Sequence, residues 1–261
     1  MSEPEPHPEQ PVLTERHART LVITLNRPKQ RNAIDAAVAH AVATALEELD
    51  ADPALAVGII TGAGGFFCAG MDLKAFAAGE RPWVDGRGFG GIVERSADKP
   101  LIAAIEGFAV AGGLEVALAC DLIVAANGAK LGIPEVKRSL VAAGGGLLRL
   151  PRMLPRNVAN ELALTGDPIS AERAHELGLV NRLAAPGQAL AAALELAATI
   201  AANGPLALAG SKRILRESAD WPQSDAFARQ AEIWEPIFDS ADAREGATAF
   251  AEKRPPVWQG K

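Results

Sequence analysis

Two glutamates, twenty positions apart, occupy places where a carboxylate could exchange protons with a substrate. Glu115 lies in the first turn of an expected helix, two residues after Gly113 and among apolar residues. Glu135 follows Pro134, whose ring fixes the local backbone. Burial of an unpaired carboxylate is costly and perturbs its pKa, which suits acid–base catalysis. The alternative from spacing alone is that Glu115 complements the helix dipole and that Glu135 is a solvated turn residue.

Backbone N–H donors are expected near the same place. Asp72 follows a glycine-rich turn and can cap a short helix that continues to Phe76. The N–H groups around Met71 would then lie at a helix start without acceptors, and those of Gly112 open the helix that carries Glu115. The sequence therefore predicts two sets of free donors beside a carboxylate.

Three other candidate sites are excluded. The stretch 86–91 matches the dinucleotide pattern G-x-G-x-x-G, but no strand precedes it and Lys99-Pro100 soon follows. Cys68 and Cys120 have no histidine in a related context and are expected to be buried thiols. Two cysteines and four scattered histidines show no metal-ligand spacing, so we expect no metal and no cofactor.

Composition narrows the class of protein. The chain has 261 residues, of which 49% are hydrophobic and 22% charged, with a net charge of -6. This balance predicts a folded cytoplasmic protein and argues against nucleic acid as a partner. Residues 1–11 are rich in glutamate and proline, which predicts a disordered acidic tail rather than an export signal. No apolar run is long enough to cross a bilayer, so no membrane partner is expected.

The predicted elements alternate between strand and helix up to residue 199, which indicates a layered α/β core over 12–199. Residues 79–91 have no periodicity and are expected to form a mobile loop. From 200 to 261 the pattern is helical only, so we expect a helical appendage. Its aromatic residues could cover its own core or pack on another subunit. The predicted strands are 21–25, 57–61, 101–105, 122–126 and the short 130–133, and the predicted helices are 35–52, 72–76, 112–120, 206–217, 224–238 and 242–253.

Several ordered blocks stand out along nearly the whole chain. They are Phe67-Cys68-Ala69-Gly70-Met71-Asp72-Leu73, Ala111-Gly112-Gly113-Leu114-Glu115, Gly132-Ile133-Pro134-Glu135, Leu164-Thr165-Gly166 and Gly178-Leu179-Val180. Together these blocks resemble the crotonase, or enoyl-CoA hydratase/isomerase, superfamily. The resemblance implies a spiral of strand-strand-helix units with a C-terminal helical trimerisation region, assembled as a homotrimer or a hexamer of two trimers.

The resemblance also implies roles for the four groups. The N–H groups of Met71 and Gly112 would form an oxyanion hole for a thioester carbonyl. Glu115 would take a proton from water, and Glu135 would supply one to the α-carbon of the acyl chain. Both glutamates are present at the family's spacing, which favours hydration of an enoyl-CoA or the reverse dehydration. The alternatives are an enoyl-CoA isomerase of the same fold and a non-catalytic acyl-CoA binder.

Three stretches depart from the family pattern. Ala111 stands where a third glycine is frequent, and Ala142-Ala143 stand where proline and glycine are frequent, on the wall near Glu135. Residues 79–97 match no pattern, and in this family that loop contributes to substrate choice.

Coenzyme A is anionic and belongs to the substrate, so an acidic protein needs local cations to bind it. Arg27, Lys29 and Arg31 follow the first predicted strand and are the leading candidates. Lys74, and Lys253 from a neighbouring subunit, are weaker ones.

Overall fold

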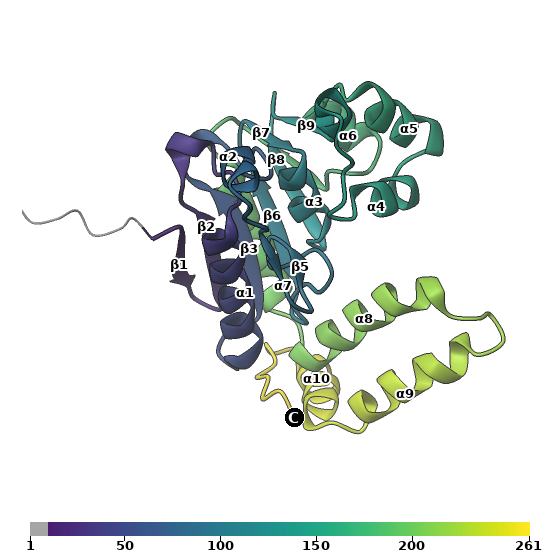
Figure 1. The fold of residues 1–261 in the computed structure, drawn as a ribbon. Helices are drawn as coiled ribbons and strands as arrows, with labels where there is room; N and C mark the ends of the chain where they lie inside the picture. The colour runs from purple at the N-terminus through teal and green to yellow at the C-terminus, as the bar shows by residue number, and fades with distance from the viewer. Residues whose placement is uncertain (1–9) are drawn as a thin grey trace, which may run out of the picture.

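A six-stranded sheet forms the centre of the structure, a computed structural model that describes residues 10–261 (Figure 1). The strand order is β1-β2-β3-β6-β8-β11, and all neighbours are parallel except the antiparallel pair β1 and β2. The strands are β1 (Val12–His17), β2 (Thr20–Leu25), β3 (Val57–Gly62), β6 (Leu101–Ile105), β8 (Leu122–Ala126) and β11 (Arg182–Ala184).

A second sheet of three short strands lies beside the first, in the order β10-β9-β7. The chain passes from β6 in the large sheet to β7 in the small sheet and then into helix α3, and it repeats the move from β8 to β9. This alternation confirms the predicted spiral of strand-strand-helix units. The members are β7 (Phe108–Val110), β9 (Lys130–Gly132), β10 (Ile169–Ser170) and α3 (Gly112–Leu118).

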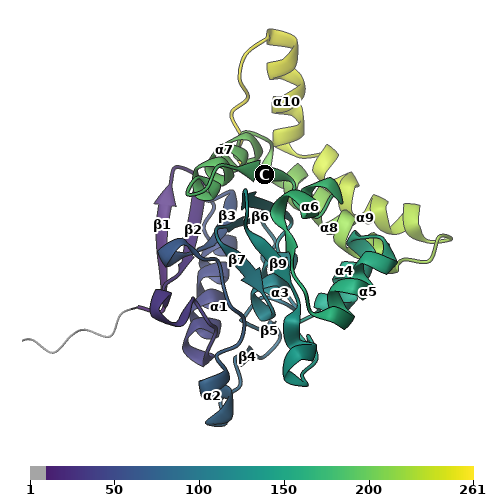
Figure 2. The same cartoon turned by 90° about the horizontal axis from the view of Figure 1, so that it is seen from above.

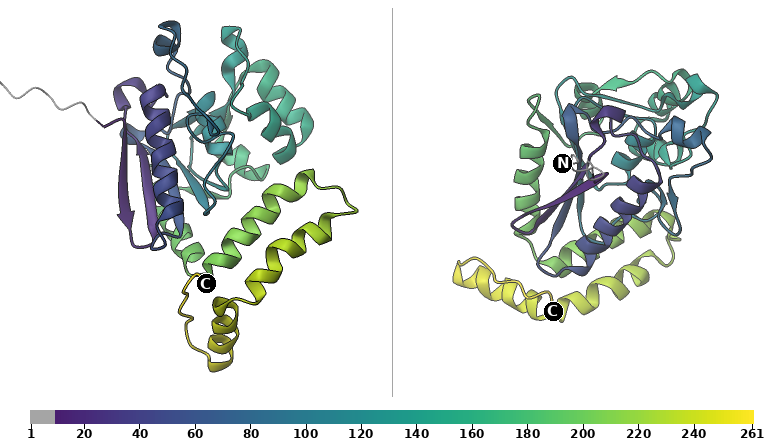
Figure 3. Two further views of the ribbon diagram at one scale, coloured as in Figure 1. Left: turned by 60° about the horizontal axis from the view of Figure 1, so that its bottom comes forward. Right: turned by 60° about the vertical axis from the view of Figure 1, so that its left-hand side comes forward.

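Helices cover both faces of the large sheet (Figures 2 and 3). Alternate side chains of a strand point to opposite faces. On β2, Leu21 and Ile23 join the core cluster that includes α1 (Ala36–Ala51), whereas Val22 joins the cluster formed with α7 (Ala189–Ala201). The predicted strands are continuous apolar runs because both of their faces are buried.

Two predicted helix caps are confirmed. Asp35 caps α1 by accepting a hydrogen bond from Val38 N–H, and Asp72 caps the short helix α2 (Leu73–Ala77) through Lys74 and Ala75 N–H. Helices α4 (Gly146–Met153), α5 (Arg156–Thr165) and α6 (Ala171–Glu176) complete the body, together with the short 3-10 helices η1 (Pro28–Gln30), η2 (Ala63–Gly65) and η3 (Pro134–Arg138).

The last three long helices form an arm that extends from the body (Figures 1 and 3). Lys212 on this arm donates to Asp121 at 2.6 Å, and the Trp258 indole N–H donates to the Ala202 carbonyl at 2.8 Å. These contacts tie the arm and the C-terminal tail to the body. The helices are α8 (Pro205–Glu217), α9 (Ala226–Phe238) and α10 (Ala241–Glu252), with the 3-10 helix η4 (Ser218–Asp220) after α8.

Within residues 10–261, no single helix has the length and apolar character needed to span a bilayer. Two consecutive helical segments reach this length and apolar character only when they are joined, and the chain bends by 108° between them. They are Ala189–Ala201 and Pro205–Asp220.

The expectation of a featureless loop at 79–91 is wrong. Trp83–Val84 (β4) and Gly88–Phe89 (β5) pair as a small antiparallel hairpin, in which Trp83 lies opposite Phe89. Each strand has only two residues, so no periodicity reveals it. Of the expected acidic tail, residues 1–9 lie outside the described part of the chain.

Candidate active site

Glu115 reaches a cavity from the first turn of α3. Strand β7 ends at Val110. The next residue, Ala111, donates its N–H to the Gly132 carbonyl at 2.9 Å, and the helix begins at Gly112. The side chain is only 3% exposed, and its Oε1 accepts the Gly146 N–H at 2.9 Å. Burial raises the pKa of this carboxyl group, and the N–H donors of Gly146 and Gly144 oppose that rise by favouring the charged form.

Glu135 reaches the same cavity from the other side, in the first turn of η3. Pro134 occupies the start of this short helix, where a missing N–H has no consequence. The buried Oε2 of Glu135 has no hydrogen-bond partner among residues 10–261. Burial, reinforced by the negative charge of Glu115, raises the pKa of Glu135 to about 7. A carboxyl group with this pKa can both donate and accept protons at neutral pH.

The peptide groups before Met71 and Gly112 lie close together. A Cβ atom placed on Gly70 would come within 2.9 Å of the Gly112 nitrogen. Ile34 holds the first segment, since its N–H donates to Gly70 O at 2.8 Å and its carbonyl accepts Asp72 N–H at 2.9 Å. These two bonds use the groups on either side of the Met71 N–H and leave it free.

Neither the Met71 N–H nor the Gly112 N–H has an acceptor in the described part of the chain. Two such donors facing one cavity can share a single oxygen. Cys68 is fully buried, as predicted, and supports the first donor segment: its thiol donates to the Asn32 carbonyl at 3.1 Å, and its sulfur accepts the Gly70 N–H at 3.3 Å. Burial raises the pKa of Cys68 to about 12, so the group remains a thiol.

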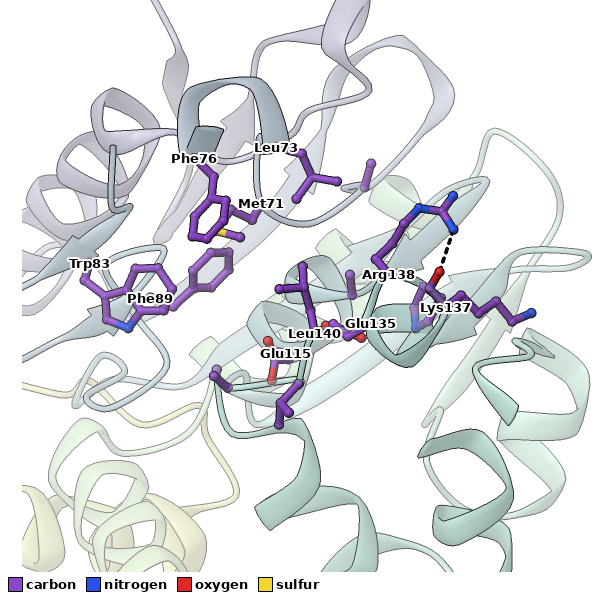
Figure 4. A pocket seen from close by; sticks show the side chains of 17 residues that line it. Met71, Leu73, Phe76, Trp83, Phe89, Glu115, Glu135, Lys137, Arg138 and Leu140 are labelled. Atoms are coloured by element: carbon purple, nitrogen blue, oxygen red, sulfur yellow. Dashed lines mark hydrogen bonds between the residues drawn. The ribbon is translucent and has the colours of Figure 1, made fainter. Parts of the chain in front are cut away.

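The cavity has a volume of about 410 Å³ and mostly apolar walls (Figure 4). Figure 4 shows Met71, Phe76, Trp83 and Phe89 on one side and the two glutamates on the other. The three aromatic residues are absent from the sequence-based site. A signal for two of them exists in Asp85-Gly86, a dipeptide typical of tight hairpin turns, placed between Trp83 and Phe89.

The predicted coenzyme A cations occupy different places, and none of them lines the cavity. Arg27 pairs with Asp35 and Asp72, each at 3.0 Å, and donates to the Ala33 carbonyl at 2.7 Å. Its guanidinium group therefore fixes the segment that carries Met71.

Lys29 is exposed on η1, and Arg31 is exposed just after it. Lys74 is exposed on α2. Lys253 lies at the end of α10, on the arm and far from α2 in this chain (Figures 1 and 2). Two further cations, Lys137 and Arg138, do line the cavity and were missed by the sequence-based prediction. Lys137 also pairs with Asp167.

Metal-ligand residues do not converge anywhere in the described residues: no group of three or more histidine, cysteine, aspartate or glutamate side chains is placed to hold an ion.

The chain is similar to known proteins over nearly its whole length. The model of the family described as enoyl-CoA hydratase/isomerase matches residues 15–261. The chain is 44% identical over 258 residues to the enoyl-CoA hydratase EchA19 of Mycobacterium tuberculosis, covering 95% of this chain and 96% of that protein. It is also 44% identical over 254 residues to the carnitinyl-CoA dehydratase of Salmonella typhi, covering 94% and 97%, respectively.

A solved structure shows the same similarity. The crystal structure of enoyl-CoA hydratase EchA1 from Mycobacterium marinum matches with a TM-score of 0.95 and 62% identity, covering 97% of this chain and all of that one (100%).

Proposed function

Because the chain belongs to the enoyl-CoA hydratase/isomerase family and is an acyl-CoA hydratase or dehydratase, a lyase, we propose that Glu115 and Glu135 perform its proton transfers. One observation carries this assignment: a single cavity joins two carboxylates, both with raised pKa, to two backbone N–H groups that have no acceptor within residues 10–261.

The thioester oxygen binds between the N–H groups of Met71 and Gly112. As water adds to the β-carbon, electrons of the double bond move toward this oxygen, and the two donors stabilise the resulting enolate. Loss of one such donor in other enzymes costs about 2.7–4 kcal/mol of transition-state stabilisation. The oxyanion hole formed by these two N–H groups therefore supplies the main electrostatic stabilisation of the transition state.

The two carboxylates divide the proton transfers. Glu115, whose Oε1 accepts the Gly146 N–H, takes a proton from the attacking water as the new C–O bond forms. Glu135, whose pKa of about 7 leaves it partly protonated at neutral pH, gives its proton to the α-carbon. Dehydration is the same sequence reversed. No cofactor is required beyond the coenzyme A portion of the substrate.

The test is a panel of 2-enoyl-CoA and 3-hydroxyacyl-CoA thioesters incubated with the enzyme and followed by mass spectrometry. Gain or loss of one water is the expected result. A shift of the double bond in a 3-enoyl-CoA, detected by deuterium uptake without hydration, would instead identify an isomerase. Tight binding of every thioester without turnover would identify a non-catalytic acyl-CoA binder.

Cations around the cavity bind the anionic carrier in this proposal. Lys29, Arg31 and Lys74 are exposed on the segments that flank Met71, and Ala69, which lines the cavity, donates its N–H to the Arg31 carbonyl at 3.1 Å. Arg138 lines the opposite wall, and Lys253 is assigned to a neighbouring subunit. Charge reversal at Lys29 and Arg31 together should raise KM for acyl-CoA while kcat changes little, with Arg244 and Arg213 as remote controls.

We also propose a homotrimer or a hexamer of two trimers, located in the cytoplasm and independent of nucleic acid and membrane. Large apolar side chains on the arm support the assembly: Phe227 is 83% exposed and Phe250 is 87% exposed. A single chain gains nothing from exposing such side chains, whereas a neighbouring subunit would bury them. Light scattering of the purified protein tests this, and a monomer would contradict it.

A further inference from the structure

The acyl side of the cavity is formed by the hairpin that replaces the expected loop. The Trp83 and Phe89 rings lie edge to face, with centroids 5.2 Å apart and planes at 68°. Phe89 is 3% exposed, whereas Trp83 is 39% exposed and closes the outer end of the wall. A paired arrangement of this kind is favourable in itself, so the wall is preformed.

The hairpin is held firmly against the body. Arg87, at its turn, is buried, and its guanidinium group lies 3.6 Å from the carboxylate of Glu47 on α1. Gly90 N–H donates to Pro82 O at 2.8 Å, and the following Ile92 is fully buried. The two rings therefore have little freedom to move away from a ligand.

Phe89 also touches the oxyanion hole. A Cβ atom placed on Gly112 would lie 2.5 Å from the Phe89 ring, so the ring packs directly on that glycine. An acyl chain whose carbonyl is held by Gly112 meets Phe89 near the reacting carbons and Trp83 farther out. The outer ring is consequently placed to contact a substituent beyond the double bond.

The aromatic faces at the outer end of the cavity are largely occupied. The guanidinium group of Arg81 lies over the Phe76 ring, 4.3 Å from its centroid, so that face is already occupied by a cation. The two carboxylates of the lining, Glu115 and Glu135, belong to the proposed reacting end of the cavity. In the Trp83–Phe89 pair one ring face is covered by the edge of the other ring. A quaternary ammonium group needs free aromatic faces, and few remain here.

We propose that Trp83 and Phe89 determine acyl specificity by selecting an uncharged acyl group with a bulky apolar substituent, such as an aryl ring, over one bearing a quaternary ammonium group. The inference rests on the proposed acyl-CoA function of this cavity. This preference would distinguish the chain from the carnitinyl-CoA dehydratase to which it is 44% identical.

Binding of saturated thioesters tests the inference without any turnover. Three probes are compared by calorimetry: butanoyl-CoA, 3-phenylpropanoyl-CoA and 4-(trimethylammonio)butanoyl-CoA. The phenyl thioester is expected to bind about tenfold more tightly than butanoyl-CoA, because its ring packs on Trp83. The ammonium thioester is expected to bind no better than butanoyl-CoA. Equal or tighter binding of the ammonium probe would overturn the proposal.

Two variants assign the effect to the hairpin. In Trp83→Ala the phenyl advantage should fall to about twofold or less, since the outer ring is lost. Phe89→Leu keeps the wall apolar but removes the aromatic pair with Trp83. It should reduce the preference for the phenyl thioester by a smaller factor than Trp83→Ala does. Leu13→Ala, on the exposed edge strand β1, is the control and should keep the wild-type ratio. An unchanged phenyl advantage in folded Trp83→Ala contradicts the assignment.

The matching unsaturated thioesters are assayed for hydration in parallel. Absence of hydration with all three would contradict the proposed function while leaving the binding preference measurable. Hydration with a preference for the ammonium substrate would contradict only the specificity.

Discussion

The carboxyl groups of Glu115 and Glu135 face one cavity but are held differently. Glu115 accepts the Gly146 N–H at 2.9 Å, whereas the buried Oε2 of Glu135 has no partner in residues 10–261. A carboxylate that accepts an N–H is stabilised in its charged form, and a buried one without a donor is stabilised as the neutral acid. This difference supports the proposal that the first glutamate accepts a proton and the second donates one.

Replacing either glutamate by glutamine should reduce turnover by roughly 10²–10⁴-fold, the usual contribution of a positioned acid or base. Neither melting temperature should fall, because glutamine has nearly the same volume and carries no charge into the buried site. The measurement is hydration of a 2-enoyl-CoA alongside thermal unfolding. Glu161→Gln, on the exposed surface of α5, is the control. Wild-type turnover in Glu115→Gln or Glu135→Gln would refute the assigned roles.

Hydration should lose rate as the pH rises through about 7. In the proposed mechanism Glu135 is the acid in this direction, and its pKa is raised to about 7, so its protonated fraction declines over that range. The pH profile of kcat/KM for a 2-enoyl-CoA measures this limb. If the alkaline limb instead lies far above neutrality, Glu135 is not the acid.

The same raised pKa predicts how stability depends on pH. A carboxyl group with a folded-state pKa above its ordinary value of 4.5 stabilises the fold most when it is protonated, below that value. This contribution is lost as the pH rises from about 4.5 through about 7. Glu135→Gln cannot titrate, so its free energy of unfolding should fall less than that of the wild type over this range. Urea unfolding at several pH values measures the difference, and parallel curves would contradict it.

Sequence patterns predicted the central strands because both of their faces are buried. Runs such as 101–105 are apolar without interruption, and the structure places β6 there. The edge strand β1 was missed because three of its four exposed positions, Thr14, Glu15 and Arg16, are polar. Hairpin β4–β5 was missed because strands of two residues show no periodicity. For the same reason the aromatic residues of the hairpin, Trp83 and Phe89, were not predicted to line the cavity.

The candidate site was only partly accessible to sequence reasoning. The glutamates and the glycine-opened helix were recognised locally, but the proximity of Met71 and Gly112 depends on a non-local bridge between Cys68 and Ala109. Arg27 was assigned to coenzyme A because it is cationic. Its pairing with Asp72, distant in sequence, appears only in three dimensions.

Gly70→Ala should remove most of the activity. The added Cβ would lie 2.7 Å from the Ala111 side chain and 2.9 Å from the Gly112 nitrogen, at a residue with φ of +94°. Because it would displace one donor of the oxyanion hole, kcat should fall roughly 10²–10³-fold. Gly65→Ala is the matched control, since Gly65 has φ of +80° and open space around it. Gly65→Ala should lose some stability and keep its kcat; an equal loss of kcat in both variants would attribute the effect to backbone strain alone.

Ala111→Gly should stabilise the protein. Ala111 has φ of +53° and ψ of -134°, a conformation that glycine adopts freely and that strains other residues by about 1–3 kcal/mol. Glycine also loses about 0.5–1 kcal/mol more backbone entropy on folding, so the expected net gain in unfolding free energy is about 0.5–2 kcal/mol. The hydrogen bond from residue 111 N–H to Gly132 O uses backbone atoms only and is retained.

Ala18→Gly provides the comparison for this variant. Ala18 has φ of +51° in the turn between β1 and β2, remote from the cavity. Both substitutions should raise the melting temperature, but only Ala111→Gly should alter kcat, because it loosens the peptide that presents the Gly112 N–H. A lower melting temperature for Ala111→Gly would show that the Ala111 methyl group contributes more by packing on Gly70 than its strained backbone costs.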